Sequence, residues 1–191
     1  MLKLHLGCGN IHLDDFINID IIKTQAVDKI MDVRNLKYED NSIETIYSAH
    51  VLEHFTSPEA PQALKEWYRV LKPGGRLIIV DPNLNRWILR YLLNPAYYLK
   101  NKILSIFTKE KVVPEIKVKE MLIGELFGGY PKYDFVNHHK TAFTPRIMNK
   151  LAKEVGFKRI ERINLDKNYF PIPQVNPKRL HWSSMAFSLT K

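Results

Sequence analysis

The chain has 191 residues, of which 45% are apolar and 26% charged, which is ordinary for a soluble globular protein with one sizeable core. Its single cysteine excludes an internal disulfide and a cysteine metal cluster. The net charge of +9 favours anionic partners, namely nucleic acid, a phosphorylated substrate or an anionic membrane surface, without choosing among them.

The start of the chain and its hydropathy indicate where the protein works. The sequence Met-Leu-Lys leads directly into a core strand, which leaves no room for a signal peptide. No run of about 18 or more uncharged apolar residues is present. We therefore expect a cytoplasmic protein that forms a single domain over residues 1–191.

The first 20 residues predict two short strands joined by a glycine turn. Lys3–Leu6 and Phe16–Ile19 have strand character, and the sequence Gly-Cys-Gly-Asn follows the first strand at once. Glycines let a backbone bend tightly and approach a ligand closely, and ligands of open α/β sheets bind at the carboxyl ends of strands. Asp20 ends the second strand, where its carboxylate is placed to accept hydrogen bonds from both hydroxyls of a ribose. The opening therefore predicts a site for a nucleoside-containing cofactor.

Two classes of cofactor use such an opening. A dinucleotide site is typified by G-x-G-x-x-G, with an acidic residue about 20 residues further on. Here His12 stands at the third glycine position, and Asp20 comes only 13 residues after Gly7. A dinucleotide is therefore the weaker candidate.

The runs LHLGCGN and INID resemble the first two motifs of the class I S-adenosylmethionine-dependent methyltransferases, whose glycine loop binds the methionine and ribose parts of the cofactor. The resemblance implies cofactor contacts from Gly7, Cys8, Gly9, Asp20 and Ile21. The sequence departs from the family at His5 and Ile11, where an acid and a third glycine are usual. About ten residues join Gly9 to Asp20, so we expect the first helix of the fold to be vestigial or replaced by a loop.

The next two strands extend this pattern. Residues 28–33 predict a third strand that ends at Asp32, and Ile43–Ala49 predict a fourth. The resemblance implies that Asp32 accepts from the adenine amino group while the Val33 N–H reaches a ring nitrogen; a solvated loop acid is the alternative for Asp32. Ser48 and Ala49, at the tip of the fourth strand, complete the expected cofactor contacts.

A helix and a central strand follow. Ser57 and Pro58 predict a helix start, with Ser57 as the N-cap, and the sequence Lys-Pro-Gly-Gly at 72–75 predicts its end. Arg76–Val80 then predict a buried strand. The stretch VLEHF…EWYRVLKPGGRLIIVDPN resembles the middle of the same methyltransferase family.

The region of about residues 84–129 is expected to be an insert with two short helices on the acceptor side. Between Leu84 and Phe127, eight Lys or Arg and four Glu accompany several aromatic residues. Such an element can roof the acceptor pocket or contact an anionic membrane surface, and both interpretations remain open. The roof is the preferred one.

The last third of the chain predicts a helix and two strands. Thr144 and Pro145 open the helix and Gly156 ends it, and residues 157–165 and 183–190 form the closing strands. We therefore expect an α/β, Rossmann-like methyltransferase fold. Its seven-stranded sheet is mostly parallel, the last strand is antiparallel, and the first helix is shortened or absent.

His50, Glu53 and His54 spell H-x-x-E-H, and their spacing places them on one face of a helix. The string lies on a turn that leaves a strand, which argues against a metalloprotease. Some methyltransferases of quinone biosynthesis resemble it with E-x-x-E-H and hold a divalent ion there. With His50 in the first position, magnesium fits less well, and we predict no metal site. The alternatives are that these side chains fix the turn or take part in catalysis.

Methyl transfer from a sulfonium is an in-line displacement, and a hydroxyl acceptor must also lose a proton. A histidine can receive that proton at neutral pH. His54 is the first candidate, with His50 and the adjacent pair His138 and His139 as the others.

The sequence thus predicts a methyltransferase that uses S-adenosylmethionine to O-methylate a small or carrier-linked acceptor of anionic, lipid-linked, glycan or quinone-like type. Two alternatives are a cofactor-binding protein without turnover and a nucleic-acid methyltransferase. The latter is favoured only by charge, because no N/D-P-P-Y/F string is present.

Overall fold

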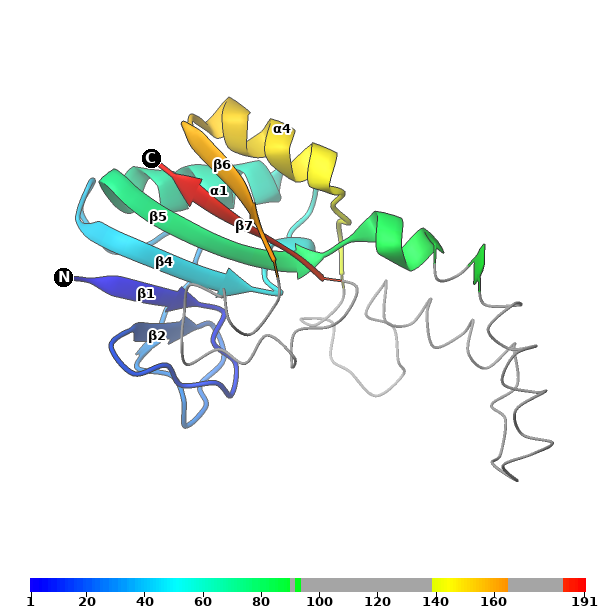
Figure 1. Cartoon of the computed structure of the whole chain (residues 1–191). Helices are drawn as coiled ribbons and strands as arrows, with labels where there is room; N and C mark the ends of the chain where they lie inside the picture. Colours follow the sequence, from blue (N-terminus) through cyan, green and yellow to red (C-terminus); the bar gives the residue numbers. More distant parts are fainter. Residues whose placement is uncertain (90–91, 94–138, 165–183) are drawn as a thin grey trace, which may run out of the picture.

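Seven strands form one sheet at the centre of the fold (Figure 1). A computed structural model of the chain describes residues 1–89, 92–93, 139–164 and 184–191. The strands are β1 (Lys3–Leu6), β2 (Ile17–Asp20), β3 (Lys29–Ile30), β4 (Ile43–Ala49), β5 (Leu71–Pro82), β6 (Arg159–Ile163) and β7 (Ser184–Thr190). Their order is β3-β2-β1-β4-β5-β7-β6. Strand β7 runs antiparallel to β5 and β6, whereas the other pairs are parallel, which confirms the predicted sheet.

The register of the parallel strands aligns their carboxyl ends. Leu6 of β1 pairs with Ile19 of β2 on one side and with Ser48 of β4 on the other. The residues that follow these three strands therefore leave the sheet along one edge. The glycine turn, Asp20 and the turn after β4 are brought together by this register.

Two helices cover one face of the sheet and pack against each other (Figure 1). They are α1 (Glu59–Val70) and α4 (Pro145–Val155). Trp67 of α1 is fully buried in this core, and its indole N–H donates to the Val33 carbonyl at 2.9 Å. This hydrogen bond fixes the segment that carries Asp32 and Val33 against the helix layer.

A loop takes the place of the first helix on the opposite face, as predicted. Residues 7–16 form turns, and Leu13 is buried among residues of β4 and β5. Asn18 of β2 holds this loop, because its side-chain oxygen accepts from the Leu13 N–H at 2.9 Å and its amide nitrogen donates to the carbonyls of Leu13 and Phe16, both at 3.1 Å. The buried His5 places its Nδ1 atom 3.0 Å from the same oxygen of Asn18. Burial lowers the pKa of His5, so His5 is a neutral structural residue at a position where the family usually has an acid.

The predicted N-cap of α1, Ser57, is wrong. The helix begins at Glu59 with Pro58 at the N-cap position and without a side-chain cap, and Thr56 contacts its first turn. The Thr56 carbonyl accepts from the N–H groups of Glu59 and Ala60, and the Glu59 carboxylate accepts from the Thr56 N–H at 2.9 Å and its hydroxyl at 2.6 Å. The Glu59 carboxylate therefore makes one half of a capping box, whereas the Thr56 hydroxyl donates to that carboxylate instead of accepting the Glu59 N–H.

Two predicted strand boundaries also need correction. Strand β5 begins at Leu71, so the Lys-Pro-Gly-Gly sequence lies inside the strand instead of before it. The reason is long-range pairing, because Lys191 exchanges backbone hydrogen bonds of 3.1 Å with Gly74 and Gly75. Strand β3 has only two residues, so the predicted strand over 28–33 is too long, and Asp32 lies beyond its end.

The ends of α4 agree with the prediction. The Thr144 hydroxyl accepts from the Ile147 N–H at 3.2 Å, and Gly156 adopts φ 116° after the last turn. Most of the predicted insert lies outside the described residues, although residues 84–89 are helical. Among the residues that the structure describes, no helix has the length and apolar character needed to cross a membrane.

The first prediction concerns the glycine turn. Gly7 has φ +67°, and a Cβ atom there would lie 2.2 Å from Cγ2 of Val51, a buried and β-branched side chain. Gly9 has φ +55°, and nothing lies within 4 Å of its Cβ position. In urea unfolding, Gly9→Ala should lower the free energy of unfolding by about 1–2 kcal/mol, because alanine disfavours the left-handed backbone. Gly7→Ala should lower it by about 1–3 kcal/mol more than Gly9→Ala does, because of the added clash with Val51. Equal losses would show that Val51 does not restrict this turn.

Candidate active site

A pocket of about 570 Å³ lies at the carboxyl edge of β1, β2 and β4. Glycine backbone, acidic side chains and histidines meet in it, together with one lysine from the segment before α4. Its lining residues are Gly7, Gly9, Asp20, Ile21, Ile22, Met31, Asp32, Val33, Arg34, His50, Val51, His54, Phe55 and Lys140.

The glycine turn is held to β2 by backbone hydrogen bonds. The N–H groups of Gly7 and Cys8 both donate to the Ile19 carbonyl, at 2.8 and 3.1 Å. The Gly9 N–H donates to a carboxylate oxygen of Asp20 at 2.8 Å. Positive φ angles at Gly7 and Gly9 allow this path, and they leave the turn without side chains beside the pocket.

Asp20 has the geometry of a hydroxyl acceptor. One carboxylate oxygen accepts from the Gly9 N–H and the other from the Ile22 N–H at 2.9 Å. Each oxygen of a carboxylate has about two lone-pair sites, so one site on each oxygen remains for a ligand. The two backbone hydrogen bonds fix the orientation of the carboxylate before any ligand binds.

Three residues predicted to contact the cofactor are not among the lining residues that the structure describes. The Cys8 side chain is buried, and burial together with the charge of Asp20 raises the pKa of its thiol to about 11. The thiol is therefore un-ionised at neutral pH, which fits a small packing residue and not a nucleophile. Ser48 is also buried, and Ala49 lies at the tip of β4.

Asp32 lines the pocket, but its carboxylate is occupied by Arg34. It accepts the Arg34 backbone N–H at 2.9 Å and guanidinium N–H groups at 2.7 and 3.1 Å. Hydrogen bonds from Arg34 lower the pKa of Asp32, and the guanidinium also lies 5.5 Å from the ring centre of Phe55. A hydrogen bond donated by an adenine amino group to Asp32 would have to replace one of these contacts. The backbone N–H of Val33 remains the second predicted adenine contact.

Histidines from separate parts of the chain gather at the opposite wall of the pocket. His50 and His54 line it, and the His54 and His139 rings meet edge to face with centroids 5.1 Å apart. His50 has φ 57°, and its Nδ1 atom lies 3.1 Å from a carboxylate oxygen of Glu53, whereas its Nε2 atom lies 3.2 Å from the Ser184 hydroxyl. Burial lowers the pKa of His50, which favours the neutral ring at pH 7.

Glu53 and Asp81 form a buried carboxyl pair beneath these histidines. Each has 1% of its surface exposed, and none of the four carboxyl oxygens has a hydrogen-bond partner among the described residues, so the pair retains a proton. Burial raises the pKa of Glu53 to about 7, and burial together with the charge of Glu53 raises that of Asp81 well above its usual value. The Glu53 carbonyl also accepts the N–H groups of Lys140 and Thr141, at 2.7 and 3.1 Å. These bonds hold the segment of His139 beside His54.

Glu53, His54 and His139 each offer one donor atom, and these atoms lie within 4.8 Å of one another. The set could hold a divalent cation, and it differs from the H-x-x-E-H string because His139 replaces His50. Sequence spacing could not have found it, since 85 residues separate His54 from His139. His138 lies outside the described residues.

Sequence reasoning also missed the residues that complete the pocket. Met31, Arg34, Val51 and Phe55 line it, and none of them belongs to a glycine or acidic motif. The acidic and basic pair Asp32 and Arg34, two residues apart, was the available signal for Arg34. Lys140 could not have been found by spacing, because its backbone hydrogen bond to Glu53 brings it to the pocket from a distant part of the sequence.

Known proteins resemble this chain in sequence over part of its length. Residues 14–79 match a family model described as a methyltransferase domain. The ubiquinone/menaquinone biosynthesis C-methyltransferase UbiE of Geotalea daltonii is 29% identical over 132 residues, which are 69% of this chain and 48% of that protein. The chain thus matches less than half of the length of this relative.

Solved structures agree on the fold. A SAM-dependent methyltransferase from Archaeoglobus fulgidus superposes with a TM-score of 0.57 at 12% identity, over 99% of this chain and 85% of that one. The 1,6-didemethyltoxoflavin-N1-methyltransferase of Burkholderia thailandensis was solved with S-adenosylhomocysteine. It superposes with a TM-score of 0.55 at 10% identity, over 100% of this chain and 70% of that one. These matches confirm the predicted Rossmann-like fold, and the family model supports the methyltransferase resemblance over residues 14–79.

The second prediction tests the buried carboxyl pair through the pH dependence of stability. An unfolded Glu53 loses its proton near its usual pKa of 4.5, whereas the folded one keeps it to about pH 7. The free energy of unfolding should therefore fall as pH rises from 5 to 8, by roughly 1–3 kcal/mol for this group.

Urea unfolding of wild type, Glu53→Gln and the exposed control Glu161→Gln at both pH values checks this. Glu53→Gln should lose less stability between pH 5 and 8 than wild type, and Glu161→Gln should behave as wild type. The same pH dependence in Glu53→Gln and wild type would contradict the retention of a proton by Glu53.

Proposed function

We propose that this protein, a class I methyltransferase in its sequence and fold, transfers the methyl group of S-adenosylmethionine to an oxygen of a small or carrier-linked acceptor. One observation supports this most directly: Gly7, Gly9 and Asp20 line the same pocket as His50 and His54. A ribose acceptor and a proton acceptor therefore meet in one pocket. A protein that only binds the cofactor would have no need of the second group.

The cofactor would occupy the half of the pocket near the glycine turn. The two ribose hydroxyls donate to the free lone pairs of Asp20, and the methionine part lies against the side-chain-free surface of Gly7 and Gly9. The adenine would lie toward Asp32 and Val33, and Ile21 also lines this part of the pocket. This orientation directs the sulfonium toward the turn after β4.

The transfer is a single displacement. The acceptor oxygen attacks the methyl carbon, the bond from that carbon to sulfur breaks, and the electron pair stays on sulfur as the neutral thioether of S-adenosylhomocysteine. The hydroxyl proton passes to a neutral imidazole. Alignment of the three reacting atoms and removal of the proton are the two tasks of the protein.

His54 is the proposed proton acceptor. His50 already has one ring nitrogen beside Glu53 and the other beside Ser184, so its role is to position the turn. The His139 ring packs against the His54 ring, and its Nε2 atom lies 3.9 Å from a carboxyl oxygen of Glu53. The role of His139 is therefore to position the His54 ring.

The acceptor class is a proposal of its own. The UbiE relative is named a C-methyltransferase of quinone biosynthesis, which favours a second candidate, transfer to a ring carbon beside a hydroxyl. The same proton acceptor would activate such a ring by deprotonating its hydroxyl. Incubation with methyl-labelled cofactor and separate lipid, glycan, protein and nucleic-acid extracts identifies the acceptor, and we expect label in the lipid or glycan extract.

The third prediction concerns cofactor affinity. Asp20→Ala removes both ribose acceptors, so calorimetry with S-adenosylmethionine should show affinity lower by roughly tenfold to a hundredfold. Asp20→Asn keeps one acceptor oxygen and should lie between this variant and wild type. Equal affinity in all three proteins, or preference of the wild type for NAD, would refute the cofactor assignment.

The fourth prediction concerns turnover. His54→Ala should lower kcat by about a hundredfold or more while the calorimetric affinity for S-adenosylmethionine stays within threefold of wild type, because the imidazole acts on the acceptor. In addition, kcat of the wild type should fall at low pH, and kcat of His54→Ala should no longer show this fall. His50→Ala serves as the comparison, and a larger effect there than in His54→Ala would exchange the two roles.

A further inference from the structure

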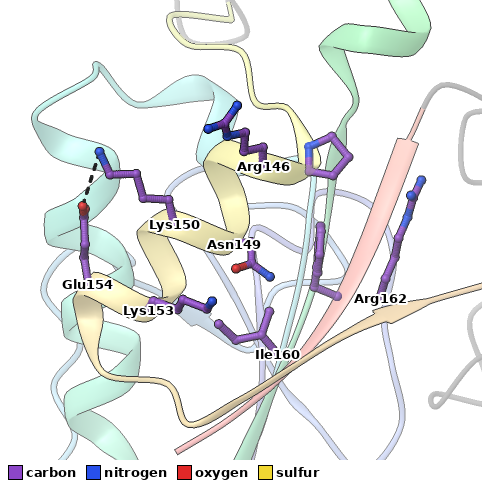
Figure 2. Close-up of a pocket in the computed structure, with 9 residues that line it drawn as sticks. Arg146, Asn149, Lys150, Lys153, Glu154, Ile160 and Arg162 are labelled. Atoms are coloured by element: carbon purple, nitrogen blue, oxygen red, sulfur yellow. Dashed lines mark ion pairs between the residues drawn. The ribbon is translucent and has the colours of Figure 1, made fainter.

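A second hollow, the α4–β6 groove, lies between helix α4 and the edge strand β6 (Figure 2). Its volume is about 710 Å³, and its lining includes Arg146, Asn149, Lys153, Ile160, Arg162 and Phe187. Figure 2 shows Asn149 and Lys153 on the helix facing Ile160 and Arg162 on the strand, while Lys150 turns toward Glu154. The groove therefore has an apolar floor and cationic walls.

The positive charge of this groove is not balanced by nearby acids. Residues 139–164 include seven Lys or Arg but only two Glu. Both acids already have partners, because Glu154 lies 3.7 Å from Lys150 and Glu161 lies 2.8 Å from Arg159. Cationic side chains without counter-charges repel one another, so an anionic ligand would reduce this repulsion.

Three cationic side chains of the groove lack an acidic partner within the described part of the chain. They are Arg146 in the first turn of α4, Lys153 in its last turn and Arg162 on β6, and all three are exposed. The fork of an arginine matches two oxygens of a phosphate, and the Asn149 amide adds a neutral donor. Phosphate oxygens are thus the ligand chemistry that this set recognises.

The groove reaches the edge of the sheet that holds the cofactor pocket. Strand β6 runs in the same direction as β5, because β7 lies between them and is antiparallel to both. Arg162 pairs with Phe187 of β7, which pairs with Ile79 of β5. Ile79 in turn pairs with Ser48 of β4, so these residues lie in one row across the sheet. Arg146 stands at the start of α4 on this same edge, six residues after Lys140, which lines the cofactor pocket. One extended ligand can therefore follow this edge from the groove to the pocket.

We infer that the α4–β6 groove binds a phosphate or diphosphate group joined to an apolar chain, and that this group is the distal end of the methyl acceptor. The phosphate oxygens bind Arg146, Lys153 and Arg162, and the apolar chain lies on Ile160 and Phe187. Assignment of the ligand as the acceptor rests on the proposed function, whereas phosphate binding by the groove does not.

Calorimetry with inorganic pyrophosphate and octyl phosphate at moderate salt tests the groove directly. The test variant is Lys153→Glu with Arg162→Glu, which reverses two cations that have no described acidic partner. The matched control is Lys65→Glu with Lys72→Glu, which changes the net charge equally at exposed sites on α1 and β5. We expect wild type to bind both probes, with octyl phosphate the tighter because of the apolar floor.

Affinity for both probes should fall tenfold or more in the groove variant and stay within twofold of wild type in the control. In a ¹⁵N-labelled sample, the side-chain amide signal of Asn149 should move on addition of pyrophosphate. Absence of binding by wild type, or equal losses in the two variants, would overturn the inference. An RNA oligonucleotide that binds more tightly than octyl phosphate through the same residues would overturn it as well.

Two further measurements distinguish a membrane lipid from a soluble ester as the ligand, and test the groove separately from the proposed function. Binding to vesicles with phosphatidylglycerol, together with octyl phosphate binding, assigns the group to a membrane lipid; octyl phosphate binding alone assigns it to a soluble ester. Phosphate binding without methyl transfer to any extract would support the groove and refute the proposed function. Methyl transfer without phosphate binding would refute the groove alone.

Discussion

The hydrogen bond from the Gly9 N–H to the Asp20 carboxylate is the contact on which the site depends. It joins the turn after β1 to the end of β2, and with the Ile22 N–H it fixes both carboxylate oxygens. The register that pairs Leu6 with Ile19 and Ser48 sets this contact beside the turn after β4. Cofactor recognition and the position of the reacting groups thus follow from one alignment of strand ends.

The second organising element is the buried pair of Glu53 and Asp81. An ionised pair of carboxyl groups would not tolerate this environment, so the pair retains a proton and interacts with the histidines above it. The Glu53 backbone carbonyl also anchors Lys140 and Thr141, which come from a distant part of the chain. A single residue therefore connects the turn after β4 to the segment before α4.

Local motifs in the sequence were sufficient to predict the cofactor half of the site. Gly7, Gly9 and Asp20 were found because a glycine turn between two strands is a local pattern, and the loop that replaces the first helix followed from the short distance between the strands. Asp81, the neighbour of Glu53, was missed because the two residues meet only when β4 and β5 pair. Arg34 was missed although it stands only two residues from Asp32. The start of α1 was predicted one residue too early, because the N-cap position belongs to Pro58 and not to Ser57.

The account rests on a cofactor bound at the carboxyl edge of β1 and β2 with its sulfur directed toward His54. Backbone amide NMR of wild type during titration with S-adenosylhomocysteine measures this most directly. The account predicts that the N–H signals of Gly7, Gly9, Ile22 and Val33 and the ring signals of His54 move together with one saturating dependence on ligand concentration. Movement confined to α4 and β6, with these signals unchanged, would contradict it.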